Sequence, residues 1–407
     1  MESTPTTTNR TAVRQAHRQK ARTQRFAAMV VAATLIVAAG GVAAFVLLGP
    51  SVARPSIARA AAHAPLHSLG TSAKAVAASA TAVVAEASRP ATLSISAVGD
   101  MIFDRQVKVL IAKSGGAAPL AEVAKHLSAA DVTVGNLESP LSTGGVKNAT
   151  KDVTFRGDPR GVEGLVSSGF DFLSLANNHV LDYGEDALAG TVAALDARDI
   201  AHAGAGADKD AAWKPAVVTR DGATVAFLSF SHILPPGFIA TSSHGGLAQG
   251  RNNMDAVVTA IRSAKQEYDY VIVSFHWGVE YQDDANAEQV RDARKAVDAG
   301  ADMVLSHHPH VIQGLEYYKG RLIAYSLGDF VFDHYSRKTG EAFILDAKLG
   351  PDGVTDVKTT PVYLDSYGKP EFVSGSTASV ILERLKLISA KHNAVVSIDG
   401  NGATVTP

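Results

Sequence analysis

The fold is decided by two stretches, YVIVSFHWG at residues 270–278 and ADMVLSHHPH at residues 301–310. Each is a short apolar run that ends in histidine, and a helical pattern over 286–299 lies between them. Apolar runs of this length predict strands buried on both faces, and the helix between them makes a βαβ unit with parallel strands. In open α/β sheets, ligands bind beyond the carboxyl ends of the strands. The histidines therefore lie where a site is expected.

The same alternation of strands and helices extends through most of the chain. Further strands are predicted at residues 93–100, 131–138, 170–178, 225–231 and 321–332, and further helices near 117–128, 159–168, 185–198 and 252–266. Two hairpins, at Asp221-Gly222 and Lys319-Gly320, and a strand-rich segment 341–373 that turns at Asp352-Gly353 add antiparallel strands. The sequence therefore predicts a layered α/β sandwich with mixed sheets over residues 91–390, followed by a C-terminal tail at 391–407.

The N-terminal part differs in composition from this domain. Residues 1–25 carry six basic residues and one acidic residue, and an uncharged apolar run, Phe26–Leu48, follows them. About 20 apolar residues suffice to cross a bilayer, and basic residues favour the cytoplasmic side. We expect a basic cytoplasmic tail, a transmembrane signal anchor at 26–49 and an Ala/Ser/Pro-rich linker at 50–90. This arrangement predicts a single-pass protein of the cell membrane with its C-terminal domain outside the cytoplasm.

Two alternatives to the anchor remain open at this stage. A signal peptide could be cleaved near Ala58-Arg59-Ala60, although its apolar region is normally only about 7 to 15 residues long. The second alternative is a soluble cytoplasmic protein. The length of the run favours the uncleaved anchor.

Composition restricts the chemistry of the predicted domain. The 407 residues include no Cys and 14 His, so any metal must be bound by imidazole, carboxylate or amide groups. From residue 91 onward there are 28 basic and 38 acidic residues. This net negative charge argues against nonspecific nucleic-acid binding, because it would repel phosphate backbones.

Polar residues follow strand after strand at the predicted carboxyl ends. They are Asp100, Glu138, Asn177-Asn178-His179, His276 and the group His307, His308 and His310. Taken singly, such residues also fit structural roles: a turn cap at Asp100, a solvated loop acid at Glu138, a core ring at His276. Their repetition at one edge of a sheet favours one or two divalent ions, of Mn, Fe, Mg or Zn.

Six segments carry a family resemblance. They are AVGDMIFDR (97–105), VGNLESPLS (134–142), LANNHVLDYG (175–184), FHWGVEY (275–281), SHHPHVIQG (306–314) and YSLGDFVFD (325–333). In this order and spacing they resemble the CapA family of poly-γ-glutamate (capsule) synthesis proteins, which is similar to the calcineurin-like metallophosphoesterases. The resemblance covers about residues 92–335 and implies a metallophosphatase-like fold.

The resemblance also implies roles for individual residues. The implied metal ligands are Asp100, Glu138, Asn178, His276, His308 and His310. His179 corresponds to the group that protonates a leaving group or stabilises transition-state charge, and Asp182 would orient its ring. The chain departs from the pattern at Ile102, where metallophosphoesterases have a histidine, and at Asp329, where the family usually has Asn. We therefore keep Asp329 outside the predicted ligands.

Two functions of different kinds follow from this resemblance. One is a metal-dependent hydrolase or transferase in the synthesis or export of poly-γ-glutamate or another capsular polymer. The other is a non-enzymatic subunit of an export complex, in which the metal organises a groove for the polymer. Both imply an anionic polymer and membrane synthase or export subunits as partners. The absent histidine at position 102 leaves catalysis undecided, because a fold alone does not establish an activity.

Overall fold

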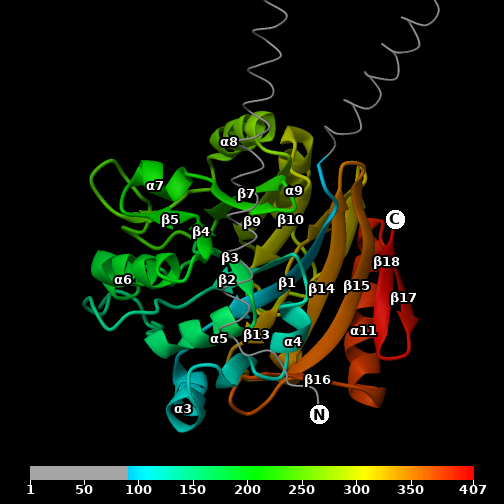
Figure 1. The fold of residues 1–407 in the computed structure, drawn as a ribbon, viewed down its shortest axis with the longest axis horizontal. Helices are drawn as coiled ribbons and strands as arrows, with labels where there is room; N and C mark the ends of the chain where they lie inside the picture. The colour runs from blue at the N-terminus through cyan, green and yellow to red at the C-terminus, as the bar shows by residue number, and fades with distance from the viewer. Residues whose placement is uncertain (1–89) are drawn as a thin grey trace, which may run out of the picture. The chain divides into compact units, whose positions relative to one another are not determined.

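The computed structural model describes residues 90–407. The predicted tail (1–25), anchor (26–49) and nearly all of the linker (50–90) lie outside the described residues. Within residues 90–407, none of the helices combines the length and the apolar character needed to span a membrane. The described part is a mixed α/β fold with several sheets (Figure 1).

The larger sheet has ten strands and contains the start of the domain. Its order is β17-β18-β15-β14-β1-β2-β3-β4, with β13 beside β1 and β16 beside β15. The strands β1 to β4 run parallel, and β14 pairs antiparallel with β1. The bounds are β1 (Leu93–Met101), β2 (Val132–Leu137), β3 (Phe170–Ser174), β4 (Ala201–Ala203), β13 (Asp329–Val331), β14 (Glu341–Gly350), β15 (Gly353–Leu364), β16 (Pro370–Phe372), β17 (Val395–Asp399) and β18 (Gly402–Thr406).

The second sheet has six strands in the order β11-β12-β10-β9-β7-β6. Its central strands β7, β9, β10 and β12 are parallel, and the predicted hairpins add β6 and β11 as antiparallel edges. The bounds are β6 (Ala216–Arg220), β7 (Ala223–Ser231), β9 (Tyr270–His276), β10 (Met303–His307), β11 (Leu315–Tyr318) and β12 (Arg321–Ala324). Two short strands, β5 (Ala205–Gly206) and β8 (Gly246–Leu247), form a separate pair.

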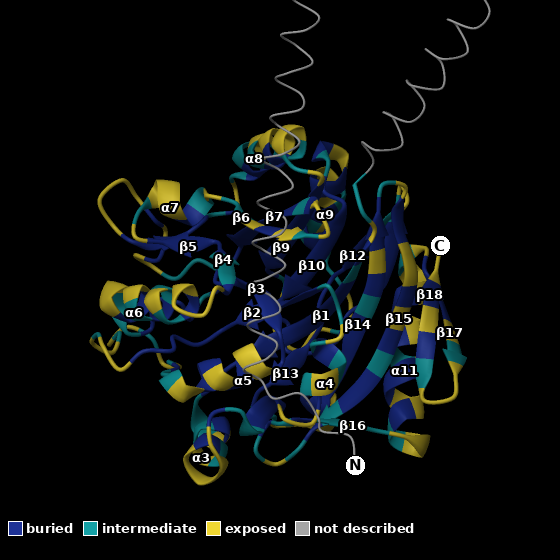
Figure 2. Cartoon of the chain, in the orientation of Figure 1, coloured by how far each residue is buried: buried dark blue, intermediate teal, exposed yellow. Residues whose placement is uncertain are grey.

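The main hydrophobic core lies between the two large sheets. Side chains alternate along each strand, so Tyr270 and Ile272 of β9 join this core while Val271 and Phe275 face the helices. Phe172 of β3 and Phe227 of β7 stack across the interface with ring centroids 4.2 Å apart. Figure 2 shows these strands as almost entirely buried. The packing of one sheet on the other therefore fixes the relative positions of the strand ends.

Helices cover the outer faces of both sheets. The helices α3 (Arg105–Ser114), α4 (Ala124–Leu127), α5 (Val162–Ser167) and α6 (Gly184–Asp196) lie with the larger sheet, and α8 (Met254–Glu267) and α9 (Ala287–Ala299) with the smaller one. The helix α9 begins at a capping box between Asn286 and Gln289 and ends at Gly300, whose φ of 119° suits glycine. This pattern of helix layers around packed sheets confirms the layered α/β prediction.

The structure differs from the sequence predictions at several elements. Residues 391–407, predicted as a tail, contain β17 and β18, and β18 pairs with β15 of the larger sheet. The helix α11 (Gly375–Ser389) was not predicted, yet its buried face joins the core between the sheets. The expected strand 321–332 divides into β12 and β13, which belong to different sheets. The helices α3, α7 (Lys209–Trp213) and α10 (Arg337–Gly340) were also not predicted.

Candidate metal centre

Strand pairing brings the predicted site residues to one edge of the sandwich. Asp100 near the end of β1 is in register with Asn136 of β2 and Asp329 of β13. In the other sheet, His276 at the end of β9 is in register with His307 at the end of β10. Parallel strands place these residues at the same end of each sheet. The convergence predicted from the sequence is thus a consequence of the strand register.

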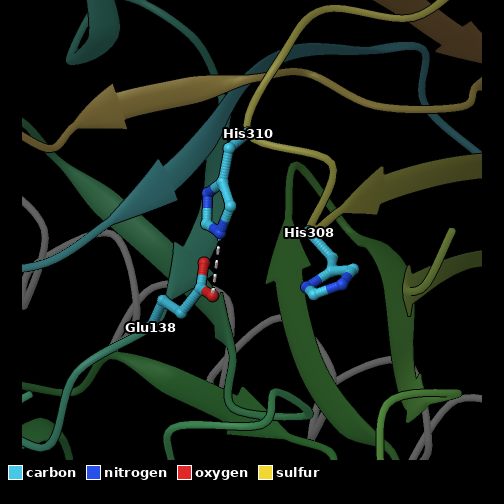
Figure 3. Close-up of side chains that lie close together, drawn as sticks. All are labelled: Glu138, His308 and His310. Atoms are coloured by element: carbon cyan, nitrogen blue, oxygen red, sulfur yellow. Dashed lines mark ion pairs between the residues drawn. The ribbon is translucent and has the colours of Figure 1, made fainter. Parts of the chain in front are cut away.

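The loop after β10 directs two histidines toward the carboxylates. His308 and His310 have φ values of 97° and 57°, a left-handed conformation that non-glycine residues adopt only when their surroundings impose it. The backbone N–H of His308 donates to Asp100 Oδ2 at 3.0 Å. In Figure 3 the His310 ring points at Glu138, with 4.0 Å between His310 Nε2 and Glu138 Oε1.

Three overlapping groups in this cluster have the spacing of metal ligands. In each, one ligand atom from every residue lies within 4.8 Å of the others. The groups are Glu138 with His308 and His310, Asp100 with Glu138 and His276, and Asp100 with His310 and Asp329. All six side chains are buried. Asn178, the remaining predicted ligand, joins them through its Oδ1 atom, 2.8 Å from His276 Nε2.

The buried polar atoms of this cluster fit a bound cation. Glu138 Oε1, His276 Nδ1 and His308 Nδ1 have no hydrogen-bond partner within the protein. Burial raises the pKa of Glu138 well above its ordinary value, and the negative charge of Asp100 raises it further. Ionising a buried carboxylate is costly, and a divalent ion would stabilise its charged form. Imidazole with carboxylate and amide oxygen suits Mn, Fe or Zn.

The imidazoles of the cluster differ in protonation. Burial and the neighbouring His310 lower the pKa of His308 to about 3, and burial with the other histidines lowers that of His276 well below its ordinary value. Burial also opposes the charge of His310, but the carboxylates of Asp329 and Glu138 raise its pKa to about 10. Neutral imidazole is the form that binds metal. His276 and His308 are therefore in the ligand form at neutral pH.

His179 and Asp182 form a pair beside this cluster. His179 Nδ1 lies 2.6 Å from Asp182 Oδ2, which also accepts a hydrogen bond from the backbone N–H of Phe155 at 2.7 Å. Lys151 contacts the other Asp182 oxygen, and its Nζ lies 3.2 Å from His179 Nδ1. Burial lowers the pKa of His179 to about 4, even though Asp182 favours the charged form.

A cavity of about 400 Å³ opens beside the cluster. Its lining includes Asn178, His179, His310 and Asp329, together with the basic side chains of Arg105 and Lys151 and the acidic side chains of Asp152, Glu280 and Asp333. Its walls thus combine candidate metal ligands, a candidate proton-transfer group and cationic side chains.

Sequence reasoning missed several residues of this region. Asn136 donates to Asp100 Oδ1 at 2.8 Å. It lies on β2, two residues before Glu138, and this position in the sequence could have indicated a place near the site. Asp329, which is not among the predicted ligands, has its Oδ1 atom 2.8 Å from His310 Nδ1. Lys151 comes from a loop with no motif, and only the tertiary structure brings it to His179.

The sequence is similar to proteins of capsule synthesis. It is 33% identical over 272 residues to "PGA biosynthesis protein CapA" of Bacillus subtilis, covering 66% of this chain and 71% of that protein. It is 32% identical over 291 residues to "Capsule biosynthesis protein CapA" of Bacillus anthracis, covering 70% of each. A "Probable polyglutamine synthesis accessory protein" of Mycobacterium tuberculosis is 34% identical over 239 residues, which cover 56% of this chain and 63% of that protein.

A family model gives the same assignment. The model described as "Bacterial capsule synthesis protein PGA_cap" matches residues 94–334. This range begins in β1 and ends just beyond β13, so it contains every residue of the candidate metal centre. The chain therefore belongs to the bacterial capsule synthesis protein family PGA_cap, as its resemblance to CapA proteins predicted.

Proposed function

We propose that this protein is a membrane-anchored component of poly-γ-glutamate or related capsular polymer synthesis or export, with a metal-dependent hydrolase or transferase site. The observation that carries the proposal is the buried cluster of imidazoles and carboxylates, in which several polar atoms lack a partner and of which His310 and Asp329 line a cavity of about 400 Å³. The kind of polymer is inferred from the names of the relatives. A metallophosphatase-like arrangement of ligands is consistent with the layered fold.

The proposed ligands are Asp100, Glu138, Asn178, His276, His308 and His310, with Asp329 as an added oxygen donor. A divalent ion bound by these groups would supply Lewis acidity toward a substrate oxygen. The proton chemistry belongs to His179. Because its Nδ1 is held by Asp182 and its pKa is about 4, the neutral ring leaves Nε2 as the nitrogen that accepts a proton at neutral pH. Arg105 and Lys151 would hold an anionic part of the substrate.

One observation favours the non-enzymatic alternative. Ile102, at the position where metallophosphoesterases have a histidine, is fully buried and packs with Phe155, Phe332 and Leu364. This position is part of an apolar cluster and offers no ligand. In this alternative, the metal organises a polymer-binding groove within a complex of membrane synthase or export subunits.

Metal analysis and assays of the full-length protein separate these functions. We expect divalent ion at this centre in the unsubstituted protein, and fewer bound ions per chain in His308→Ala/His310→Ala. His179→Ala should keep the ion but lose turnover of phosphoesters or γ-glutamyl polymer. Asp182→Asn should lower this turnover. If polymer secretion by cells carrying His179→Ala equals that of the parent, the enzymatic role is excluded and the binding role remains. A protein that binds no divalent ion under any loading condition would refute both.

Cell fractionation tests the proposed anchor. The full chain should be found in the membrane fraction, with its C-terminal domain accessible to protease added outside the cytoplasmic membrane. Replacing residues 1–49 with a cleavable signal peptide should release the domain in soluble form. Recovery of the full chain from the soluble fraction, or protection of the domain in cells with a permeable wall, would refute the anchor.

A further inference from the structure

A second group of potential ligands lies on the opposite face of β9 from the candidate metal centre. His232 follows directly after β7, and its backbone N–H donates to the carbonyl oxygen of His276 at 2.9 Å. Its ring meets Phe275 and Trp277 edge to face, with centroids 5.5 Å apart in both cases. Because side chains alternate along a strand, these neighbours point away from the side chain of His276. The two sites are therefore separated by the strand itself.

The His232 ring is buried and lacks partners. The residue is 3% exposed, and neither Nδ1 nor Nε2 has a hydrogen-bond partner within the protein. A neutral imidazole always carries one N–H donor and one acceptor nitrogen, and leaving both unsatisfied in a buried site is energetically costly. The ring packs directly against Gly250, where a Cβ would lie 2.7 Å from His232 Cδ2. The two unsatisfied nitrogens therefore indicate that the His232 ring binds a ligand.

Two carboxylates from α9 face this ring. Glu288 and Asp292 are four residues apart, so they lie on the same side of the helix. One ligand atom each from His232, Glu288 and Asp292 lies within 4.8 Å of the others, yet the ring makes no hydrogen bond to either carboxylate. Atoms that share one ion at about 2.0–2.2 Å are separated by distances of this order. The spacing fits a bound ion better than a direct contact.

Arginine side chains currently balance the charge of these carboxylates. Arg291 donates to both oxygens of Asp292 at 2.8 Å and lies 3.7 Å from Glu288, and Arg251 lies 3.8 Å from Glu288. The Arg291 side chain is 55% exposed. Because the Arg291 end of this pair is largely exposed, its guanidinium can move into solvent when a cation takes its place.

We propose that His232, Glu288 and Asp292 form a second binding site for a divalent transition-metal ion, with water completing the coordination. One imidazole and two carboxylates suit Zn²⁺ or Mn²⁺ better than Ca²⁺, which prefers oxygen alone. The ion would tie the start of α9 to the end of β7, next to the strand that carries His276. The site is independent of the proposed function, because it shares no side chain with the candidate metal centre.

Zinc binding by the full-length protein tests this site. After chelation and removal of the chelator, Zn²⁺ is added and the tightly bound ions per chain are counted by elemental analysis. Glu288→Gln and His232→Asn should each bind one ion fewer than the unsubstituted protein. His244→Asn is the matched control, because His244 also lies beside a glutamate, 3.6 Å from Glu185, but is exposed. Its ion count should not change.

Two further variants make the test decisive. Arg291→Gln removes the competing guanidinium from Asp292 and should tighten Zn²⁺ binding. His308→Ala/His310→Ala, which disrupts the candidate metal centre, should still bind the ion that Glu288→Gln loses. If Glu288→Gln, a change at a partly exposed position, leaves the ion count and the affinity as in the unsubstituted protein, the proposal is refuted and buried water satisfies His232. An equal loss in His244→Asn would show adventitious zinc only and would also refute it.

Discussion

Asp329 adds a third carboxylate to a centre where the family resemblance leads us to expect an amide. Its Oδ1 atom lies 2.8 Å from His310 Nδ1, and burial raises its pKa to about 7. We predict that Asp329→Asn keeps the hydrogen bond but loses the charge, so divalent-ion affinity falls about tenfold. The loss should be greater at about pH 8 than at about pH 6, because Asp329 is ionised above its pKa.

Competition with a coloured chelator measures this affinity. Asp333→Asn is the control, because Asp333 lines the cavity but belongs to none of the three ligand groups of the centre. An affinity unchanged in Asp329→Asn at both pH values would show that Asp329 only orients His310.

Lys151 acts on His179 through its charge. Its Nζ lies 3.2 Å from His179 Nδ1, and its positive charge is one of the influences that lower the pKa of His179, after burial. We predict that Lys151→Met raises the pKa of His179 above its value of about 4, because the repulsion is removed while Asp182 remains. NMR titration of the His179 ring measures the shift. Lys113→Met, at an exposed lysine that contacts Tyr367, should leave the pKa unchanged; a fall in Lys151→Met would contradict the argument.

At the scale of elements, a histidine–aspartate pair joins α4 to β14. His126 Nε2 lies 2.8 Å from Asp346 Oδ2, and this hydrogen bond raises the pKa of His126. A group whose pKa is higher in the folded state stabilises the fold below its unfolded pKa of about 6.5, and the contribution is lost as pH rises through the folded value. We predict that His126→Gln lowers the free energy of unfolding at about pH 5.5 more than at about pH 8.5.

The effect should be below about 1 kcal/mol, because both side chains are about one-third exposed. Urea unfolding at the two pH values measures it. A larger loss at the higher pH would have the wrong sign and would rule out the ion pair as the cause.

The helix α11 stabilises the fold through one face. Leu385 is fully buried in the core between the sheets, whereas Leu387, two residues later, is 69% exposed. We predict that Leu385→Ala lowers the free energy of unfolding by about 2–5 kcal/mol. Leu387→Ala makes the same chemical change on the outer face and should stay within about 0.5 kcal/mol. Similar losses in both variants would contradict the one-sided packing of α11.

The sequence predicted the parallel strands well because each is a continuous apolar run closed by polar residues. The helix α11 was missed although its buried residues Ala378, Ile381, Leu382, Leu385 and Ile388 follow helical spacing. The strands β17 and β18 give a weaker signal. At the start of β17, Val395 is exposed and only the next residue, Val396, is buried. The roles of Lys151 and His232 could not be predicted from the sequence. Lys151 meets His179 only in the tertiary structure, and only the tertiary structure shows that the buried His232 ring lacks hydrogen-bond partners.

At the scale of the whole molecule, the two sheets supply different ligand atoms to the centre. The larger sheet and the loops that follow its strands provide the oxygens of Asp100, Glu138 and Asp329. The smaller sheet and its loop provide the nitrogens of His276, and of His308 and His310. A complete centre therefore exists only when the sheets are packed together. An ion that binds there must stabilise that packing.

We predict that a divalent ion raises the melting temperature through this linkage. An ion at about 100 times its dissociation constant stabilises the folded state by about 2.7 kcal/mol if it does not bind the unfolded chain. Scanning calorimetry with Mn²⁺ and with chelator measures the shift, in a Glu288→Gln background so that the second site does not contribute. Adding His308→Ala/His310→Ala should abolish most of it, because the smaller sheet then offers only His276. An equal melting temperature with ion and with chelator would show that the two sheets meet there without a metal between them.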